Sequence, residues 1–485
     1  MTQFDKRNIS MMMDFYEMTM ANGYFVSGGE NTRVAFDVFY RRNPDNGGFA
    51  IFAGLEQIIE YVENMHFDES DIEYFRAQNI FSEEFLNYLS NFHFHGDIYA
   101  FPEGTIMYPN EPFMTVVADL IDAQLVETAI LSQVNHQSLI ATKARRIVRS
   151  AEGRFVSDFG ARRAHNMDAA TYGARAAFIG GAAGTSNTLA GKIYGIPVMG
   201  TMAHSWIMAF PSELEAFRAY AQIYPTNAVF LIDTYDTLRS GIKNAIIAGR
   251  ELVEKGYNFG VRLDSGDISY LTREVRKELD KAGFPQAKIC VSNELTEEII
   301  ETLVLKNTPI DSWGVGTHMV TGGNEASFTG VYKLGARHDE KTNEMKAAMK
   351  FSDNPEKNTN PGIKNVYRLY DAEGNAKADI IALEDEKIEA GTEYRYYHTM
   401  IDYRQFTFKA SKVEPMLKKV VADGKRVDEK ITEAEVLRKA RETMQKQLES
   451  FDGSYKRILN PHIYKVSLTE AMKNLKMEFI KARIK

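Results

Sequence analysis

The stretch Tyr257-Asn-Phe-Gly-Val-Arg-Leu-Asp-Ser-Gly-Asp-Ile-Ser269 changes character twice within thirteen residues, from apolar to charged and then to a helix start. Residues 259–263 have the bulk of a short buried strand, yet Arg262 lies within it and Asp264 follows it. A buried charge is costly unless it is paired or holds a ligand. The stretch therefore predicts a strand that ends in a polar site.

A turn and a helix follow this strand. Ser265 and Gly266 supply the turn, and Asp267 supplies an N-cap for a helical pattern over 268–282. Backbone N–H groups and the positive end of a helix then lie beside Arg262, which suits a phosphate or a carboxylate. A structural turn with one Arg–Asp pair explains the same residues, so both interpretations stay open here.

Composition limits the class of protein. The 485 residues are 44% hydrophobic, which favours two or three globular domains. A net charge of -8 argues against a general nucleic-acid surface. Cys290 is the only cysteine, and no apolar run approaches membrane-spanning length or resembles a signal peptide at the start. We expect a cytoplasmic protein with neither nucleic acid nor a membrane as partner.

Alternation of strand and helix patterns dominates the middle of the chain. Candidate strands lie at 154–159, 177–180, 197–201, 229–233, 259–263, 288–291, 312–315 and 331–334. Most are separated by helical stretches, which predicts a parallel sheet with right-handed crossovers, closed or nearly closed into a barrel. Polar residues gather where these strands end, and in such a fold the carboxyl ends of the strands form the site.

The flanking segments have other patterns. The first part is mixed α and β, and 123–150 is helical, nearly free of Gly and Pro. The predicted domains are 1–122, a connector at 123–150, a catalytic barrel at 151–338, a loop or lid at 339–364, and a tail at 365–485 that packs on the first part.

Residues 200–206 follow an apolar segment, so we expect His204 at the mouth of the barrel. Neutral imidazole there can act as a base or as a nucleophile toward phosphorus. Arg162 and Arg163 follow another strand, where a guanidinium can hold an anion at two points. For both motifs a structural role is a comparable explanation.

Two glycine-rich loops resemble phosphate cradles. Residues 180–187 open a helix but do not form a Walker A loop, because Gly191-Lys192 is followed by Ile193. Residues 314–317, followed by 321–323, form the second loop, near the last barrel strands, where barrels often bind phosphate.

Two further patterns compete with these. His93 and His95 share one face of a strand without an apparent third metal ligand. Lys333 lies on a predicted strand, as in Schiff-base aldolases that act on sugar phosphates.

Taken in chain order, the motifs resemble nicotinate phosphoribosyltransferase over nearly the whole chain. They are Asp14-Phe15-Tyr16-Glu17-Met18-Thr19-Met20, Phe159-Gly160-Ala161-Arg162-Arg163-Ala164, Gly184-Thr185-Ser186-Asn187, Gly200-Thr201-Met202-Ala203-His204-Ser205, Val261-Arg262-Leu263-Asp264-Ser265-Gly266-Asp267, Gly314-Val315-Gly316-Thr317 and Gly330-Val331-Tyr332-Lys333-Leu334. The resemblance implies an α/β fold of the type II phosphoribosyltransferases, an irregular or incomplete α/β barrel with an α+β domain built from the N- and C-terminal segments. It also implies a homodimer with shared active sites.

The implied reaction transfers phosphoribosyl from 5-phosphoribosyl 1-diphosphate to nicotinate, forming nicotinate mononucleotide and diphosphate, with coupled ATP hydrolysis. In this resemblance His204 is the histidine that ATP phosphorylates, Arg262 and Asp264 assist catalysis, and Mg²⁺ is held by Asp264 or Asp267 through water. The implied nicotinate contacts are Tyr16 of the partner subunit, Phe159, Arg162, Ser186, Thr201 and Arg262. The implied phosphoribosyl and phosphate contacts are Ser265, Gly266, Gly314, Gly316, Thr317, Gly322 and Gly323.

Specificity for nicotinate rests on Ser186. Nicotinamide-using relatives have aspartate at this position, whereas serine is neutral and can donate to a carboxylate. Alternatives that stay open are a nicotinamide or quinolinate phosphoribosyltransferase, the Lys333 aldolase, and a non-catalytic nucleotide-binding protein.

Overall fold

The computed structural model describes residues 7–484 apart from 353, 355, 356 and 402. The chain divides into two compact units. Unit 1 comprises Met1–Thr142 and Ser327–Lys485, and unit 2 comprises Lys143–Ala326. Among the described residues, no helix is long and apolar enough to cross a membrane.

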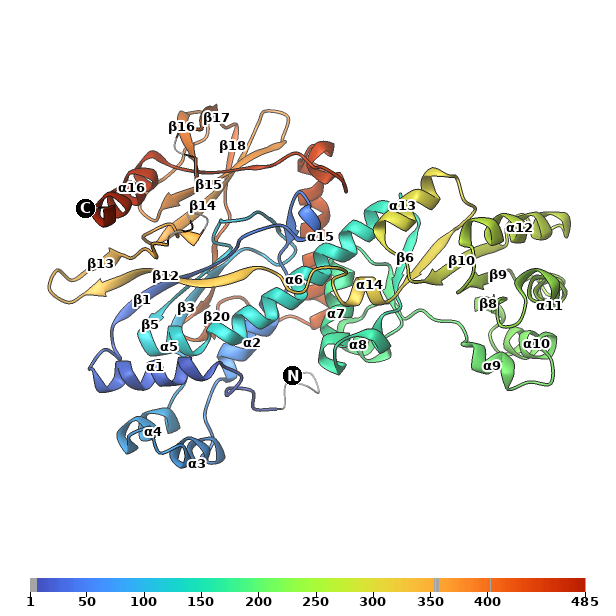
Figure 1. Cartoon of the computed structure of the whole chain (residues 1–485), viewed down its shortest axis with the longest axis horizontal. Helices are drawn as coiled ribbons and strands as arrows, with labels where there is room; N and C mark the ends of the chain where they lie inside the picture. Colours follow the sequence, from blue (N-terminus) through green and yellow to red (C-terminus); the bar gives the residue numbers. More distant parts are fainter. Residues whose placement is uncertain (1–6, 353, 355–356, 402, 485) are drawn as a thin grey trace. The chain divides into compact units, whose positions relative to one another are not determined.

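Unit 2 is built on a six-stranded parallel sheet in the order β7-β6-β11-β10-β9-β8 (Figure 1). Its strands are β6 (Phe155–Asp158), β7 (Gly184–Thr185), β8 (Ala228–Leu231), β9 (Phe259–Leu263), β10 (Lys288–Asn293) and β11 (Ser312–Val315). Strands β8 to β11 lie side by side in chain order, and β11 then pairs with β6, the first strand of the unit. The order is that of a barrel opened between β7 and β8, which confirms the predicted incomplete α/β barrel.

Helices connect these strands and lie around the sheet in Figure 1. They are α7 (Met167–Ile179), α8 (Thr188–Tyr194), α9 (His204–Met208), α10 (Glu213–Ile223), α11 (Ile242–Val253), α12 (Ile268–Lys281), α13 (Glu297–Leu305) and α14 (Thr317–Val320). Helix α12 begins as its sequence predicts, because the Asp267 side chain accepts a hydrogen bond from Tyr270 N. It buries Thr272, Val275 and Leu279, which the helical period places on one face.

Three predicted strands of the barrel are wrong. Residues 177–179 end helix α7, where an alanine-rich sequence favours helix. In 197–201 only Val198 makes a β-bridge, parallel to Thr185 at the open edge of the sheet. Residues 331–334 do form a strand, but it pairs in an antiparallel sheet of unit 1.

Unit 1 contains a seven-stranded sheet in the order β13-β12-β1-β5-β3-β19-β20, whose pairs are all antiparallel. Its strands are β1 (Arg33–Tyr40), β3 (Gly96–Ala100), β5 (Met114–Asp119), β12 (Gly330–Asp339), β13 (Glu344–Ala347), β19 (Lys418–Ala422) and β20 (Lys425–Arg426). Strands from both ends of the chain therefore share one sheet, as the resemblance implied.

A second, six-stranded sheet of unit 1 has the order β17-β16-β21-β15-β14-β18, and β2 pairs with β4. The bounds are β2 (Ala50–Ile51), β4 (Ile106–Met107), β14 (Lys364–Tyr370), β15 (Ala376–Leu383), β16 (Glu393–His398), β17 (Gln405–Lys409), β18 (Lys412–Pro415) and β21 (Lys465–Leu468). In the segment predicted as a tail, β14 and β15 pair antiparallel as a hairpin.

A large apolar core of unit 1 includes one face of the seven-stranded sheet, and the following helices belong wholly or in part to this unit. They are α1 (Phe15–Val26), α2 (Leu55–Asn64), α3 (Glu69–Ala77), α4 (Glu83–Ser90), α5 (Leu120–Leu125), α6 (Glu127–Ser150), α15 (Glu433–Ser450) and α16 (Glu470–Ile484). Short single turns are the 3-10 helices Pro44–Asn46, Ala161–Arg163, Pro225–Asn227 and Gly453–Lys456 and the π-helix Thr237–Gly241.

The division of the chain differs from the predicted boundaries at two places. It falls within α6, after Thr142, because this helix contributes its first half to the core of unit 1. It also falls at Ser327, because β12 pairs with β1. The predicted loop or lid at 339–364 begins as a hairpin of β12 and β13.

Candidate active site

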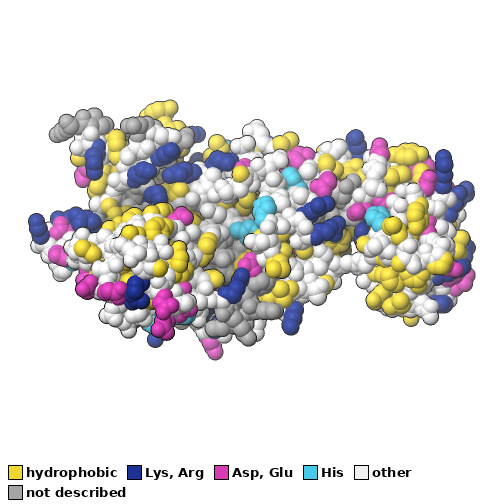
Figure 2. Space-filling model, turned by 60° about the horizontal axis from the view of Figure 1, so that its bottom comes forward, with side chains coloured by type: hydrophobic (Ala, Val, Ile, Leu, Met, Phe, Trp, Pro, Cys, Tyr) yellow, Lys and Arg dark blue, Asp and Glu magenta, His cyan; other side chains and the backbone are white. Residues whose placement is uncertain are grey.

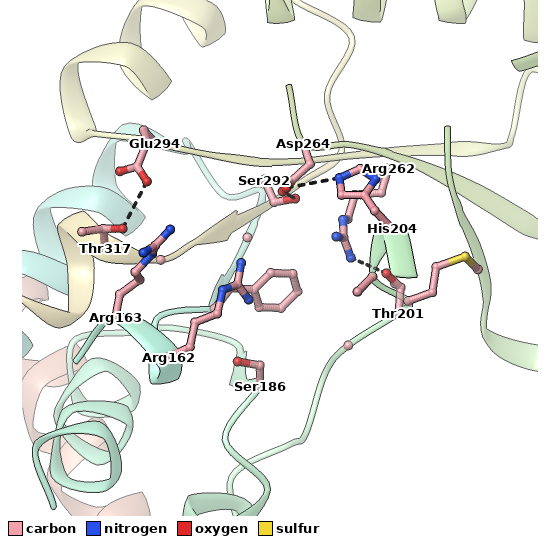
Figure 3. Close-up of a pocket in the computed structure, with 16 residues that line it drawn as sticks. Arg162, Arg163, Ser186, Thr201, His204, Arg262, Asp264, Ser292, Glu294 and Thr317 are labelled. Atoms are coloured by element: carbon pink, nitrogen blue, oxygen red, sulfur yellow. Dashed lines mark hydrogen bonds and ion pairs between the residues drawn. The ribbon is translucent and has the colours of Figure 1, made fainter. Parts of the chain in front are cut away.

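A cavity of about 570 Å³ opens at the carboxyl ends of the parallel strands of unit 2 (Figure 3). Its lining residues are Phe159, Arg162, Arg163, Ser186, Gly200, Thr201, Met202, Ala203, His204, Arg262, Asp264, Ser292, Glu294, Gly314, Gly316 and Thr317. Parallel strands point the same way, so the polar residues that end them in sequence meet at one edge in space.

Arg262 lies on β9 with its side chain toward the cavity (Figure 3). Its Nη1 donates a hydrogen bond to Thr201 Oγ1, which joins β9 to the loop before α9. Its Nε is buried and, among the described residues, has no hydrogen-bond partner. A half-buried guanidinium with an unused donor is suited to an anionic ligand.

His204 is the first residue of α9, and its side chain is 40% exposed at the cavity. The ring Nδ1 lies 3.0 Å from Thr234 Oγ1, and Nε2 lies 3.9 Å from Asp264 Oδ2. Ser292 Oγ donates to the other oxygen of Asp264 at 2.6 Å. The histidine is thus placed between a hydroxyl and a carboxylate, and the hydroxyl contact fixes the orientation of the ring.

Asp233 fixes the loop that carries Asp264. Its Oδ2 accepts hydrogen bonds from Asp264 N at 2.9 Å and from Ser265 Oγ at 2.6 Å. Its Oδ1 is buried without a hydrogen-bond partner among the described residues. Asp233 lies two residues after the end of β8, so two neighbouring strand ends position one carboxylate.

Asp158 fixes another part of the cavity wall, from β6 on the other side of the sheet. Its side chain is buried at the end of β6, and its two oxygens accept from Gly160 N and Thr185 Oγ1, each at 2.8 Å. Its backbone oxygen accepts from Ser186 N at 2.8 Å. Burial raises the pKa of Asp158, and the two hydrogen bonds oppose this effect. These contacts fix Phe159 and Ser186 in the cavity wall.

The Phe159 ring packs directly over Gly314, where a side chain would clash with it. A Cβ on Gly314 of β11 would lie 2.5 Å from the Phe159 ring, and Phe159 N donates to Val315 O at 2.8 Å. The ring therefore occupies the space that a side chain at residue 314 would fill. Gly314 in the predicted glycine loop thus serves an aromatic wall of the cavity.

Arg162 and Arg163 form a short 3-10 helix after β6, and both are exposed. In Figure 3 both side chains extend into the cavity, and Arg163 points toward Thr317 and Glu294. Thr317 Oγ1 donates to Glu294 Oε1 at 3.2 Å. This end of the cavity therefore combines two guanidinium groups with a hydroxyl.

Most of the predicted site residues of unit 2 meet in this cavity, but five do not line it: Ser265, Gly266, Asp267, Gly322 and Gly323. Ser265 and Asp267 are engaged as a partner of Asp233 and as the cap of α12. Gly266 has φ of 82°, and Gly322 and Gly323 have φ of 79° and 70°, which are turn conformations that favour glycine. Tyr16 lies on α1 of unit 1.

Sequence reasoning noted Asp158, Asp233, Ser292 and Glu294 only as polar strand ends and gave them no role, and it did not single out Thr234. Their signal was position alone, since each follows or ends a strand of the sheet. Which of their atoms meet depends on the stagger of neighbouring strands, and the sequence does not encode this stagger locally.

The carboxylates at the cavity fit a hydrated magnesium ion. Asp264 and Glu294 both line the cavity, and Mg²⁺ prefers carboxylate and water oxygens. Asp233 Oδ1, buried and without a partner among the described residues, lies on the residue that positions Asp264. Asp267 uses one oxygen to cap α12.

The competing motifs lie in unit 1. Lys333 lies on β12 of the antiparallel sheet, and its Nζ contacts Tyr332 O and lies 3.9 Å from Glu127 Oε1. Lys333 is therefore not on a strand of the parallel sheet, contrary to the aldolase interpretation. His95 Nδ1 lies 3.2 Å from Asp423 Oδ1.

Charges of both signs and hydrophobic patches occur together on the face drawn in Figure 2. This surface agrees with the expectation that anion binding is built locally rather than by a general basic surface.

Three family models match the chain in succession. They describe the nicotinate phosphoribosyltransferase N-terminal domain over residues 11–135, the nicotinate phosphoribosyltransferase family over 155–391 and the nicotinate phosphoribosyltransferase C-terminal domain over 363–476.

Relatives with the same description span nearly all of the chain. Nicotinate phosphoribosyltransferase of Bacillus subtilis (strain 168) is 40% identical over 98% of this chain and 96% of its own length. The Caenorhabditis elegans protein of that name is 34% identical over 95% of this chain and 92% of its own length.

Two solved structures share the fold. The crystal structure of human nicotinic acid phosphoribosyltransferase superposes with a TM-score of 0.84 at 26% identity and covers 96% of this chain and 99% of the human chain. Nicotinate-nucleotide pyrophosphorylase from Pyrococcus furiosus gives 0.70 at 25% identity, covering 93% and 97%.

The order of the motifs, the opened parallel barrel with its cavity, and the relatives along the whole length agree, and the chain belongs to the nicotinate phosphoribosyltransferase family of enzymes.

Proposed function

We propose that this enzyme transfers phosphoribosyl from 5-phosphoribosyl 1-diphosphate to nicotinate and couples the transfer to ATP hydrolysis through His204. The ring nitrogen of nicotinate forms a bond to C1 of the ribose while the bond from C1 to diphosphate breaks. The products are nicotinate mononucleotide and diphosphate. This is a reaction of NAD biosynthesis.

The observation that carries the proposal is the pairing of anion donors with a neutral wall in one cavity. Arg262 has a buried Nε without a partner among the described residues. Ser186 lines the same cavity and brings no charge. A carboxylate substrate needs donors, and an arginine with a nearby serine supplies them, whereas an amide also needs an acceptor.

Each substrate has a part of the cavity in this proposal. Phe159 stacks on the pyridine ring, while Thr201, Ser186 and Arg262 orient its carboxylate. Gly316 and Thr317 hold the 5-phosphate. Arg162 offsets the negative charge of the bound anions, so catalysis consists mainly of positioning and charge stabilisation as the ribose becomes cation-like.

His204 is suited to accept a phosphoryl group. The charge of Asp264, 3.9 Å from Nε2, favours the ring proton on that nitrogen, and the lone pair of Nδ1 is then available for attack once the Thr234 hydroxyl turns away. A bond forms from Nδ1 to the γ-phosphorus of ATP as the bond to the ADP oxygen breaks. Water later takes the phosphoryl group as phosphate. Mg²⁺ bound at Asp264 through water would neutralise phosphate charge.

A homodimer completes the site in this proposal, with Tyr16 of one subunit serving the cavity of the other. Tyr16 is 46% exposed on α1, although burial and the neighbouring Glu127 raise the pKa of its phenol. An exposed aromatic side chain available to a second subunit supports this assignment.

The test is formation of nicotinate mononucleotide from the two substrates with and without Mg-ATP, followed by a search for acid-labile phosphate on the protein. ATP should stimulate the wild type and label it. Turnover of nicotinamide or quinolinate in place of nicotinate would overturn the substrate assignment.

We expect His204→Ala to keep a low transferase activity, because Arg262 and the other residues proposed to bind the substrates remain. The variant should lose ATP stimulation and the phosphate label. The matched control is Thr234→Val, which removes the hydroxyl on Nδ1 but keeps the nucleophile and should still be labelled. Full ATP stimulation in His204→Ala would remove His204 from this role.

A further inference from the structure

Four ionisable side chains form a buried cluster behind the cavity wall: Lys143, Arg146, Glu297 and His318. Lys143 Nζ and Arg146 Nε each lie 2.9 Å from Glu297 Oε1, and His318 Nε2 lies 3.0 Å from Glu297 Oε2. The side chains of Lys143 and Glu297 are each 1% exposed. None of the four lines the cavity.

The carboxyl group of Glu297 is ionised in this cluster. Burial raises the pKa of the Glu297 carboxyl group. The hydrogen bond from His318 and the cations Lys143 and Arg146 lower it by more, so this pKa lies well below its usual range. An ionised carboxylate only accepts hydrogen bonds, so His318 Nε2 carries a hydrogen.

Glu297 and His318 join the two loops that form one end of the cavity. Glu297 begins α13, three residues after Glu294, and His318 follows Thr317 directly. Glu294 and Thr317 line the cavity and bond each other at 3.2 Å. The loops are therefore joined twice, at the cavity wall and behind it.

The same cluster packs against the glycine turn after α14. Gly323 has a positive φ, and a Cβ there would lie 2.8 Å from both His318 Cε1 and Lys143 Nζ. Lys143 lies on α6, a helix of 24 residues. The turn, both cavity loops and a long helix thus converge on one ionic cluster.

A metal ion is a competing explanation, because Glu297, Glu298 and His318 come close enough to share one. Lys143 and Arg146 already bond the Glu297 oxygen, and a divalent cation beside them would be repelled. The geometry favours a cluster neutralised by the protein's own cations.

We propose that Lys143, Glu297 and His318 are positioning residues that set the affinity of this end of the cavity for the phosphate of the phosphoribosyl substrate. They act by fixing Gly316 and Thr317 through the joined loops. The inference rests on the proposed function, which places the 5-phosphate at these two residues.

The experiment compares wild type with His318→Leu, His318→Gln and Lys143→Met. The readouts are the affinity for ribose 5-phosphate by calorimetry, the KM of each substrate, and the Tm. We expect His318→Leu and Lys143→Met to weaken ribose 5-phosphate binding by about tenfold and to raise the KM of the phosphoribosyl substrate similarly. The KM of nicotinate should change little.

His318→Gln should restore most of the affinity, because its amide nitrogen can reach Glu297 from nearly the position of Nε2. The control is Arg218→Met, which breaks the Arg218–Glu251 pair between α10 and α11 of the same unit without touching a cavity loop. This control should leave both KM values unchanged.

Unchanged ribose 5-phosphate binding in His318→Leu would overturn the inference, and so would a parallel rise of both KM values with a fall in Tm. Should Lys143→Met fail to fold, the two His318 variants decide. The affinity for ribose 5-phosphate is measured in the absence of nicotinate. A wild type that binds it but makes no nicotinate mononucleotide therefore refutes the proposed function and leaves the inference standing.

Discussion

Single residues decide the chemistry of the cavity because their backbone is fixed by neighbours outside it. Ser186 shows this, since its backbone N–H is held by Asp158 and its neighbour Asn187 caps α8. A new side chain at residue 186 will therefore stay in the cavity wall rather than move away. Substitutions there test charge and not folding.

We expect Ser186→Asp to lower kcat/KM for nicotinate by about tenfold or more, because two carboxylates would face each other in a site with little water. The check is a pair of saturation curves for nicotinate and nicotinamide. Ser186→Asn, neutral and similar in size, should lose much less. Equal nicotinate kinetics in wild type and Ser186→Asp would place Ser186 outside the carboxylate subsite.

At the scale of an element, strand β11 is built so that an aromatic ring can lie over it. Gly314 leaves the space in which the Phe159 ring packs, and β6 and β11 are neighbours in the sheet. At residue 314 the strand therefore has no side chain to pack, and the space is filled by the ring that forms the cavity wall.

Gly314→Ala should displace Phe159 and raise the KM of nicotinate by about tenfold, since the new Cβ would lie 2.5 Å from the ring. Steady-state kinetics with each substrate varied in turn measure the effect. Gly453→Ala is the control, because a Cβ there meets nothing within 4 Å. A change in the KM of the phosphoribosyl substrate alone would contradict this interpretation of β11.

Helix α1 carries a carboxyl group whose ionisation opposes folding. Glu17 is fully buried, accepts from Thr128 N at 3.1 Å, and has one oxygen without a partner among the described residues. Burial raises the pKa of Glu17 to about 7. Because the folded state favours the protonated form, its contribution to stability is present at low pH and is lost as the pH rises from the unfolded pKa toward 7.

Glu17→Gln should therefore be more stable than wild type at pH 8 and differ least at pH 5, with a change of at most about 3 kcal/mol across this range. Urea unfolding of both proteins at several pH values gives the difference. A difference that does not vary with pH would show that Glu17 titrates in the folded protein as it does in the unfolded chain.

At the scale of the whole molecule, unit 1 depends on contacts between segments far apart in the chain. Arg368 of β14 is fully buried and bonds Asp379 through Nε and Nη2 at 2.9 and 2.6 Å. It also bonds Ile106 O at 2.7 Å and Gln447 Oε1 at 3.0 Å. One guanidinium thus connects β4, β14, β15 and α15.

Removing this connection should destabilise unit 1 strongly. We expect Arg368→Met to cost about 3–5 kcal/mol in urea unfolding, because Asp379 would remain buried without its cation. The double variant Arg368→Met/Asp379→Leu should recover part of this loss. A double variant whose loss of unfolding free energy equals the sum of the losses in Arg368→Met and Asp379→Leu would show that the two residues act independently.

The sequence by itself determined most of the alternation of strands and helices in unit 2, and the placement of Arg262 and Asp264 at the end of a strand. These features depend on local patterns, such as an apolar run ended by charge or an aspartate at the start of α12. It also determined the family, because the motifs occur together and in order.

Only the tertiary structure decided how distant segments meet. The strand over 331–334 pairs with β1 of unit 1 and not with the parallel sheet, although its sequence suits both. The bonds from Asp158 to Thr185 and from Asp233 to Ser265 depend on which strands are neighbours. So does the cluster around Glu297, whose partners come from residues up to 154 positions apart. Such contacts follow from packing across the whole unit, which no local pattern in the chain encodes.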